Sequence, residues 1–338
     1  MEHGDISPES NQIAGTSATS MVSFKTGHNV TSLRAVEADC VGIVTRTKNR
    51  PTLLERSIRS VLGQTYKNWA HIVVNDGGDR NALENIFSRY ASRYQGKLTL
   101  IDNPEAIGAV PSLNVGLRAC QSDYVVTHDD DDSWEPEFLE KSIGALKRRK
   151  KLIPNTRGIM CHTTAVVERA DNTSVVERYR FSWNGWVRAV TLVQLAATNF
   201  IPPISFVYER EVLSEIGFFN NLKFADDWEF YLRFLSKFDI AVLPEHLANW
   251  HLRPESKDSY GNTVEVDRER DHAAIVAALR NDLIRQDLAS GKLGLGFLVA
   301  LSSRGPQTGS IRHQIWGARQ RILARWQPRV LIRRLLGS

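Results

Sequence analysis

Short apolar runs that alternate with segments of helical periodicity constrain the fold of this chain more than any other feature. The apolar runs lie at 40–45, 71–75, 98–102 and 124–128, and the helical patterns at 51–62, 81–94, 111–120 and 137–150. Strands that alternate with helices form βαβ units, in which helices cover both faces of a parallel sheet. We therefore predict an α/β fold with a Rossmann-like, mainly parallel central sheet.

The chain after residue 150 has a more mixed pattern. Gly158–Glu168 and Val175–Ser182 are typical of antiparallel strands, and Asp227–Phe238 has helical spacing. We divide the ordered part into two halves, 37–150 and 151–290. Ligands of parallel sheets bind at the carboxyl ends of the strands, so we expect the first half to bind the main ligand. The second half should complete the site with a mixed sheet.

The two ends of the 338-residue chain differ in composition from its middle. Residues 1–36 are rich in Ser, Thr, Gly and Asn and are predicted to be a disordered tail. Residues 291–338 contain Lys and Arg but no Asp or Glu, and arginines alternate there with apolar residues from Ile311 onward. This pattern predicts a basic amphipathic tail that contacts a membrane surface. A basic helix packed on its own domain is the open alternative.

Overall composition excludes several classes of protein. The formal net charge of +5 is too mild to imply nucleic-acid binding. The N-terminus lacks the apolar segment of a signal peptide, and no apolar run approaches the ~18 residues that span a bilayer. We expect a cytoplasmic protein, at the inner face of the cell membrane if the tail binds there. Cys40, Cys120 and Cys161 are predicted to be reduced core thiols.

Four consecutive aspartates, Asp129–Asp132, follow the last predicted strand of the first half. Ligands of open α/β sheets bind at the carboxyl ends of the strands, where this run lies together with the loops 45–50 and 75–80. Adjacent ionised carboxylates repel one another, and a hard divalent cation relieves that repulsion. The run therefore predicts a Mg²⁺ or Mn²⁺ site. A solvated acidic turn that caps the next helix is the alternative.

A second acidic pair, Asp226 and Asp227, stands among aromatic residues about a hundred positions later. Apolar neighbours raise the pKa of a carboxylate and suit it to general-base work. The same residues would also serve as the N-cap of the following helix. His251 is a lone histidine, which is more often structural than a ligand or a phosphate contact.

These residues together resemble the family 2 glycosyltransferases of the GT-A fold. The resemblance covers roughly residues 38–255 and rests on several motifs in the right order. The motifs are VGIVTRTKNR at 41–50, SVLGQTY at 60–66, IVVNDGG at 72–78, the spacing of Asn103, Gly108, Asn114 and Gly116, DDDDSW at 129–134, and the pair Asp226-Asp227. Asn75 departs from the pattern, because the family usually has an acidic residue there.

The resemblance implies a role for each matching position. Arg46, Thr47 and Asp76 would contact the base of a nucleotide-sugar, and Asp129 and Asp131 would hold Mn²⁺ or Mg²⁺ against its diphosphate. Asp227, paired with Asp226, would be the general base. His251 would lie near the diphosphate as a further metal ligand. The remaining donor-binding positions implied by the resemblance are Asn49, Gly108, Asn114 and Asp130.

The implied reaction is an inverting, metal-dependent transfer of a sugar from a nucleotide-diphosphate donor, with UDP-sugars favoured, to a hydroxyl acceptor. A saccharide or lipid-linked saccharide of a surface polysaccharide pathway is the expected acceptor. Two alternatives stay open. One is a catalytically silent nucleotide-sugar-binding or scaffold protein. The other is a sugar nucleotidyltransferase, against which the loop Arg46–Arg50 counts because it lacks glycine.

Overall fold

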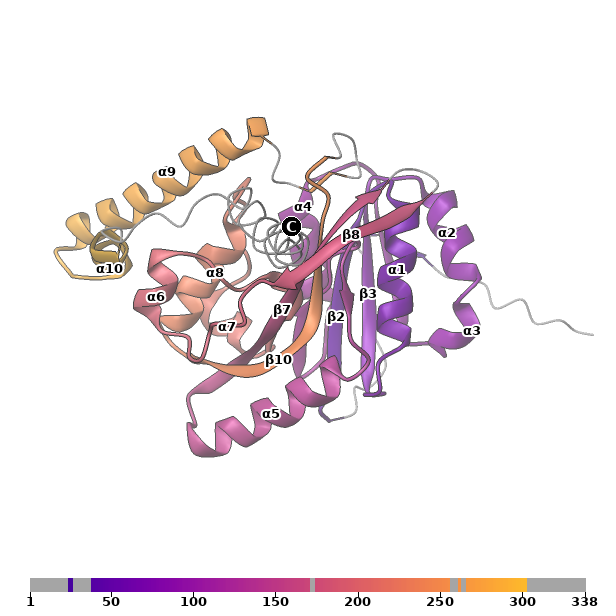
Figure 1. Ribbon diagram of the computed structural model, residues 1–338, viewed down its shortest axis with the longest axis horizontal. Helices are drawn as coiled ribbons and strands as arrows, with labels where there is room; N and C mark the ends of the chain where they lie inside the picture. Colours follow the sequence, from indigo (N-terminus) through magenta and orange to yellow (C-terminus); the bar gives the residue numbers. More distant parts are fainter. Residues whose placement is uncertain (1–23, 27–37, 171–173, 256–260, 263–265, 303–338) are drawn as a thin grey trace, which may run out of the picture.

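The computed structural model describes residues 24–26, 38–170, 174–255, 261–262 and 266–302, and its centre is one twisted sheet (Figure 1). In the described residues the sheet has ten strands. Nine follow the order β1 (Phe24–Thr26), β4 (Leu98–Asn103), β3 (Trp69–Asp76), β2 (Val41–Thr47), β5 (Tyr124–Thr127), β9 (Phe206–Glu209), β7 (Thr156–Ala170), β10 (Asp239–Leu252) and β6 (Ser133–Trp134). The tenth, β8 (Val175–Ser182), pairs with β7.

The strands from β1 to β5 are all parallel, as the alternating pattern predicts. Beyond β5 the sheet becomes mixed. Strand β9 is antiparallel to both β5 and β7, β8 is antiparallel to β7, and β10 is parallel to β7. The predicted fold class, a mainly parallel GT-A-like sheet continued by a mixed half, is confirmed.

Helices cover both faces of the sheet because residues of opposite parity on each buried strand point to opposite sides. Val41 and Ile43 of β2 pack against one helical layer, and Val44 packs against the other. The first layer contains α1 (Pro51–Leu62), α2 (Arg80–Ser88), α3 (Ala91–Tyr94) and α5 (Phe138–Leu152). The second contains α4 (Ala109–Ala119), α6 (Leu192–Ala197), α7 (Val212–Ile216) and α8 (Asp226–Leu235).

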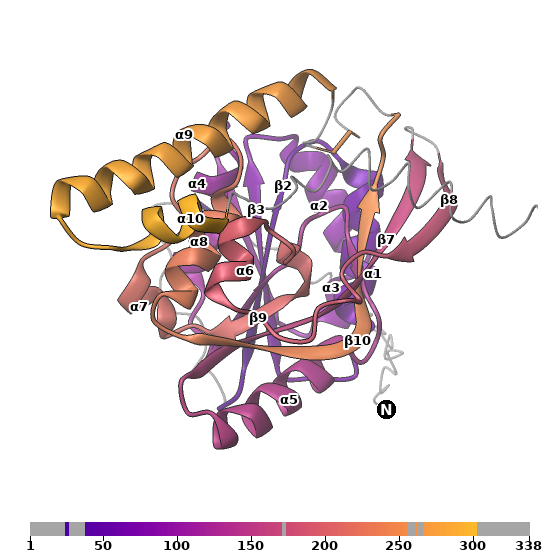
Figure 2. The ribbon, with the colours of Figure 1, turned by 60° about the vertical axis from the view of Figure 1, so that its left-hand side comes forward.

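Two further helices extend the second layer. Helices α9 (Val266–Ser290) and α10 (Leu295–Ser302) lie side by side next to α6 and α8 (Figure 2). The carboxylate of Asp287 accepts hydrogen bonds from the backbone N–H groups of Gly294 and Phe297, at 2.9 and 2.7 Å, and so fixes the turn between them. Val299 is fully buried. The first part of the segment predicted as a basic tail therefore belongs to the packed structure.

Strand β10 is irregular in the middle. Its pairing with β7 shifts register between Leu243 and His246 and again between His246 and Ala248. Five steps along β10, from Leu243 to Ala248, therefore match two steps along β7, from Cys161 to Thr163. Side chains alternate between the two faces of a strand, so an odd number of extra residues reverses the alternation. Because β10 has three extra residues here, each side chain beyond the shift faces the side opposite to the one that uninterrupted alternation predicts.

Other expectations differ in detail. Phe24–Thr26 forms a strand inside the predicted N-terminal tail, and the remainder of 1–36 lies outside the described residues, as does 303–338 with its amphipathic pattern. The predicted helix at 81–94 is two helices, because Arg89 and Tyr90 separate them. The three cysteines are buried thiols, as predicted. Within the described ranges, no helix combines the length and apolarity needed to cross a bilayer.

The contact of α4 with the sheet depends on Gly116. A Cβ atom there would lie 2.4 Å from Cγ1 of Val44 and 3.1 Å from Cγ2 of Val74. We expect Gly116→Ala to lower the free energy of unfolding by about 1–3 kcal/mol, because overpacking forces the helix away from the strands. Chemical denaturation measures this. Gly144→Ala in α5 is the control: its Cβ would meet only the side chain of Arg148, and a gain of about 0.5–1 kcal/mol is expected. Equal losses in both variants would contradict the close packing.

Candidate active site

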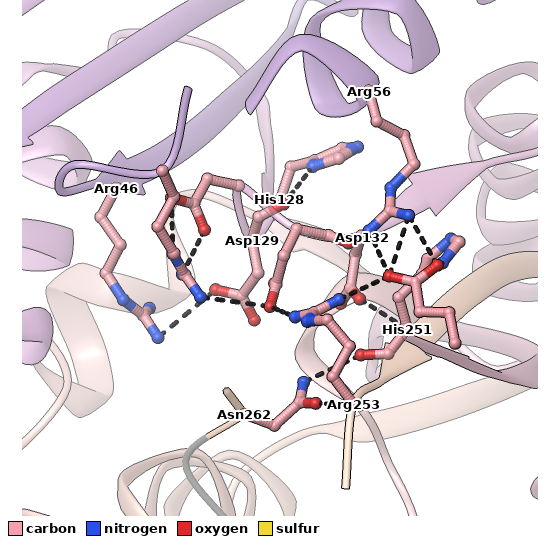
Figure 3. A network of polar contacts seen from close by, with 12 residues as sticks. Arg46, Arg56, His128, Asp129, Asp132, His251, Arg253 and Asn262 are labelled. Carbon is pink, nitrogen blue, oxygen red and sulfur yellow. Dashed lines mark hydrogen bonds and ion pairs between the residues drawn. The ribbon is translucent and has the colours of Figure 1, made fainter. Parts of the chain in front are cut away.

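The acidic run lies at the carboxyl edge of the parallel strands, between β5 and β6. The rings of the two residues that flank its ends, His128 and Trp134, contact each other. The ring centroids of His128 and Trp134 are 4.1 Å apart, and the indole N–H of Trp134 donates to the carbonyl of Ile204 at 2.7 Å. The backbone N–H of Asp132 donates to the carbonyl of Asp129, which closes a tight turn. The turn therefore brings Asp129 and Asp132, both labelled in Figure 3, close together at this edge of the sheet.

Every aspartate of the run has at least one polar partner. Asp129 pairs with Arg46, with 3.3 Å between Oδ1 and Nη2, and Asp130 pairs with Arg50 through two hydrogen bonds. Asp131 lies 3.3 Å from Nη1 of Arg50 and also contacts the guanidinium of Arg253. Oδ1 of Asp132 accepts the backbone N–H of His251 at 2.9 Å. Three of the four carboxylates thus face a guanidinium group.

Glu168, at the end of β7, links three elements behind the run. It accepts hydrogen bonds from Arg56 of α1, at 2.8 and 3.0 Å, and from Nη1 of Arg253, at 2.7 Å. Its Oε2 also lies 2.8 Å from Nδ1 of His251. Arg56 in addition donates to the backbone carbonyl of Asp131. Glu168 therefore connects α1, β7 and the end of β10 to the acidic run.

The pKa values of these carboxylates follow their partners. Burial opposes ionisation of Glu168, but hydrogen bonds from His251 and Arg56 outweigh it and lower its pKa to about 2. Burial likewise opposes ionisation of Asp131, whose pKa is nevertheless lowered because Arg50 and Arg253 lie close to it. Burial raises the pKa of Asp130, and burial together with Asp131 raises that of Asp132 well above its ordinary value.

The side chains predicted to hold a metal do not fit one ion as they stand. Nδ1 of His251 is bonded to Glu168 and its Nε2 lies 2.9 Å from Oγ of Ser133, so neither ring nitrogen is directed at Asp129 or Asp131. The carboxylate of Asp131 is held by two guanidinium groups. Among the described residues, no group of three or more His, Cys, Asp and Glu side chains could hold a metal ion.

The second acidic pair opens α8. Ala225 occupies the N-cap position in a left-handed conformation, with φ of 61°, and its side chain makes no capping bond. Asp226 and Asp227 lie in the first turn, so the N-cap is Ala225 and neither of the two aspartates predicted for that position. Oδ2 of Asp227 accepts the side-chain N–H of Asn199 at 2.9 Å, and its Oδ1 accepts the N–H of Trp228 at 2.7 Å.

Asp227 has the pKa that a general base requires. Burial raises it to about 7, and the negative charge of Asp226 acts in the same direction. Arg46 connects this pair to the acidic run, because the charges of Asp129 and Asp226 both raise the pKa of its guanidinium against the effect of burial. The two acidic clusters, about a hundred residues apart in sequence, therefore flank one arginine.

Several residues predicted to bind the donor form hydrogen bonds within the protein. Asp76 accepts the backbone N–H groups of Ile107 and Gly108 and the hydroxyl of Ser112. Asn114 bonds both the carbonyl and the N–H of Phe219. The side-chain oxygen of Asn49 accepts the N–H of Asp79 at 2.7 Å. Gly108 has φ of 101° where α4 begins, and Thr47 is buried at the end of β2.

Sequence reasoning missed four charged residues of this site: Arg50, Arg56, Glu168 and Arg253. Arg50 ends the loop 45–50, which the sequence pattern places at the carboxyl end of a strand. Its position therefore could have indicated that it belongs to the site. Arg253 follows His251 by two residues, which places both on the same side of an extended chain. Nothing in the sequence connects Glu168 or Arg56 to the aspartates, because these contacts span 75 to 112 positions.

Residues 42–217, just over half of the chain, match the model of glycosyl transferase family 2. The chain belongs to this family. The match extends from β2 to the end of α7 and so includes the acidic run and Glu168. Asp226, Asp227, His251 and Arg253 lie beyond it.

Two bacterial relatives match shorter stretches of this chain. A putative glycosyltransferase EpsE of Bacillus subtilis is 33% identical over 110 residues, 32% of this chain and 39% of that protein. The putative colanic acid biosynthesis glycosyl transferase WcaA of Escherichia coli is 33% identical over 99 residues, which are 29% of this chain and 35% of that protein. The chain thus spans less than two fifths of these relatives. The solved mannosyltransferase PcManGT of Pyrobaculum calidifontis has a TM-score of 0.49 and 16% identity, covering 85% of this chain and 81% of that one.

The Glu168 network should contribute measurably to stability. We expect Glu168→Gln to lower the free energy of unfolding by about 3–5 kcal/mol at neutral pH, because the buried Arg253 loses a charged partner. The pKa of Glu168 is lower in the folded protein than its ordinary 4.5. Its contribution is therefore complete above pH 4.5 and lost as the pH falls through about 2.

Denaturation of both proteins as a function of pH measures this effect, and the two stabilities should converge in acid. Glu177→Gln is the matched control, since Glu177 pairs with Arg180 at the surface and should contribute less than about 1 kcal/mol. A difference between wild type and Glu168→Gln that does not change with pH would contradict the assigned ionisation.

Proposed function

We propose that this protein is an inverting glycosyltransferase that transfers a sugar from a nucleoside-diphosphate donor, with UDP-sugars favoured, to a hydroxyl acceptor. The observation that carries the proposal is Asp227, a carboxylate with a pKa of about 7 that shares Arg46 with the acidic run. Membership of family 2 supports the class of reaction. On this proposal, the base and the donor site would lie on either side of Arg46 and would come from different halves of the chain.

In the proposed reaction, Asp227 takes the proton of the acceptor hydroxyl as its oxygen attacks the anomeric carbon. The bond between that carbon and the diphosphate oxygen breaks, and its electron pair leaves with the nucleoside diphosphate. Attack and departure on opposite sides of the sugar invert the configuration. Asn199 and the N–H of Trp228 orient the carboxylate of Asp227, and each of its oxygens keeps a further lone pair for the acceptor.

The donor-binding roles of Arg46, Thr47, Asn49, Asp76, Gly108, Asn114 and Asp130 are part of this proposal. Asp76 and Asn49 support it indirectly, since their hydrogen bonds shape the loops 104–108 and 77–79 beside β3. Asp76 would reach a nucleotide base only by sharing its oxygens with those loop N–H groups. Asn114 bonds the backbone of Phe219 and would contribute to the donor site by holding α4 in place.

A divalent cation, Mn²⁺ or Mg²⁺, is the cofactor that the sequence predicts. When bound, such an ion stabilises the charge of a departing diphosphate. Asp129 and Asp131 would have to release Arg46, Arg50 and Arg253 before they could bind it. The side chains, as they are paired in this structure, do not fit the ion.

The acceptor that we propose is a saccharide or lipid-linked saccharide of a polysaccharide pathway. The name of the WcaA relative, which refers to colanic acid biosynthesis, supports this class.

Contact with the inner face of the cell membrane through the basic segment is part of the same proposal. Because α10 belongs to the packed structure, we expect truncation after Ser302 to abolish sedimentation with anionic liposomes while the protein stays folded. Sedimentation that is unchanged by the truncation would contradict the membrane contact.

The catalytic role of Asp227 predicts a defined kinetic defect. Asp227→Asn should lower kcat by about 10²–10⁴, the usual contribution of general-base catalysis, with little change in nucleotide affinity. In the wild type, kcat/KM should rise with pH through about 7, as Asp227 loses its proton, and the variant should lack this limb. Initial rates with a panel of nucleotide-sugars and calorimetric titration of the nucleotide measure both quantities.

The matched control for this experiment is Asp239→Asn, at an exposed position that begins β10. It should leave the rate and its pH profile unchanged. A second readout is stability: Asp227→Asn should stabilise the protein above pH 7 more than below it, because the native state is then spared a buried charge. Normal turnover in Asp227→Asn would contradict the assignment of the base.

A further inference from the structure

Arginine side chains pair with the carboxylates of the acidic run. Four adjacent carboxylates repel one another unless a cation lies between them, and this repulsion would favour a bound metal ion. In this structure Arg46 faces Asp129, Arg50 contacts both Asp130 and Asp131, and Arg253 contacts Asp131 (Figure 3). The repulsion that would draw in a divalent ion is therefore already relieved by guanidinium groups.

Arg253 lies between two carboxylates, one of which, Asp131, is a predicted metal ligand. Its side chain is completely buried and its two terminal nitrogens bridge Asp131 and Glu168. Glu168 in turn is held by Arg56 and His251, so the bridge is fixed from behind. Removing a buried guanidinium from two carboxylates leaves uncompensated charges, which costs several kcal/mol. Arg253 is thus a built part of the site and is not free to leave it.

Arg46 and Arg50 differ from Arg253 because they lie at the rim. Their side chains are 26% and 23% exposed. Arg46 also lies near Asp226, on the side of the proposed base. A guanidinium has more N–H donors than the contacts to Asp129, Asp130 and Asp131 use, and its planar fork matches the geometry of phosphate oxygens. Both side chains can therefore bind a diphosphate while the carboxylates hold them in place.

We propose that Arg46 and Arg50 bind the donor diphosphate directly, that Arg253 is a positioning residue that neutralises Asp131 in place of a metal ion, and that the transfer requires no divalent cation. This inference rests on the proposed function and deepens it. As the sugar–oxygen bond breaks, its electron pair passes to the leaving diphosphate, whose added charge is met by Arg46 and Arg50. The acceptor proton goes to Asp227, so no further reactant is needed.

The first test is calorimetric titration of the full-length protein with UDP and with GDP, in excess EDTA and in millimolar Mn²⁺. For the nucleotide that binds, we expect Kd to differ by less than about threefold between the two conditions. Arg50→Gln should weaken binding by roughly tenfold to a hundredfold, the range for losing charge-assisted hydrogen bonds. Arg59→Gln is the matched control, in the helix α1 that begins directly after Arg50, with a side chain that is 67% exposed and paired with Glu55. It should bind like wild type.

The second test asks whether Arg253 excludes a metal. Electron paramagnetic resonance of added Mn²⁺, with UDP present, should show no more bound ion with wild type than with UDP alone. Arg253→Ala opens the space between Asp131 and Glu168 and should gain a Mn²⁺ site, together with Mn²⁺-stimulated donor hydrolysis. A purely structural arginine would give a less stable variant without this gain. If Arg253→Ala does not fold, the wild-type titrations decide.

The outcomes separate the two proposals. Nucleotide binding that survives EDTA, weakens in Arg50→Gln and persists in Arg59→Gln supports the inference. Binding that appears only with Mn²⁺ overturns it and leaves the proposed transferase in place with a metal. Binding of neither nucleotide in either condition, with no transfer from any nucleotide-sugar, overturns the proposed function and the inference with it.

Discussion

The carboxylate of Glu168 receives three cationic or hydrogen-bonding side chains from two directions, and the arrangement of the site depends on it. Arg56 reaches it from the first helix, while His251 and Arg253 reach it from the last strand of the sheet. An unpaired carboxylate would not remain ionised at 4% exposure. The elements that carry these partners must therefore come together around it, and the aspartates that contact Arg50 and Arg253 are placed as a consequence.

Arg46 has a comparable role on the other side of the site. It lies between Asp129, which follows β5, and Asp226, which begins α8. Asp129 and Asp226 belong to the first and second halves of the chain. A charge shared between them couples the part of the protein that would hold the donor to the part that would activate the acceptor. Burial and the charge of Asp226 raise the pKa of Asp227 to about 7, while the charge of Arg46 opposes the rise in the pKa of Asp226.

The sequence predicted the parallel strands well because each is a short, continuous apolar run buried on both faces, as in Val41–Thr47 and Trp69–Asp76. It also located Asp129–Asp132 and Asp226–Asp227, since runs of like charge are conspicuous. It did not predict their cationic partners. Repulsion between adjacent carboxylates is readable from sequence, but its relief depends on which distant side chains the fold brings near. Helix α9 was missed for a related reason: its apolar residues form no continuous stripe.

The register shift in β10 determines which residues meet the aspartates. Simple alternation from Ile240 and Ala241 would assign the opposite faces to the residues beyond Ala248. The extra residues between Leu243 and Ala248 reverse this, so His251 and Arg253 face the acidic run while Trp250 and Leu252 pack with Ala165 and Val167. The chemistry of this edge is therefore set by chain length at a point remote from it. A homologue with one residue fewer in that stretch would present tryptophan and leucine to the aspartates, and would need a different cation there.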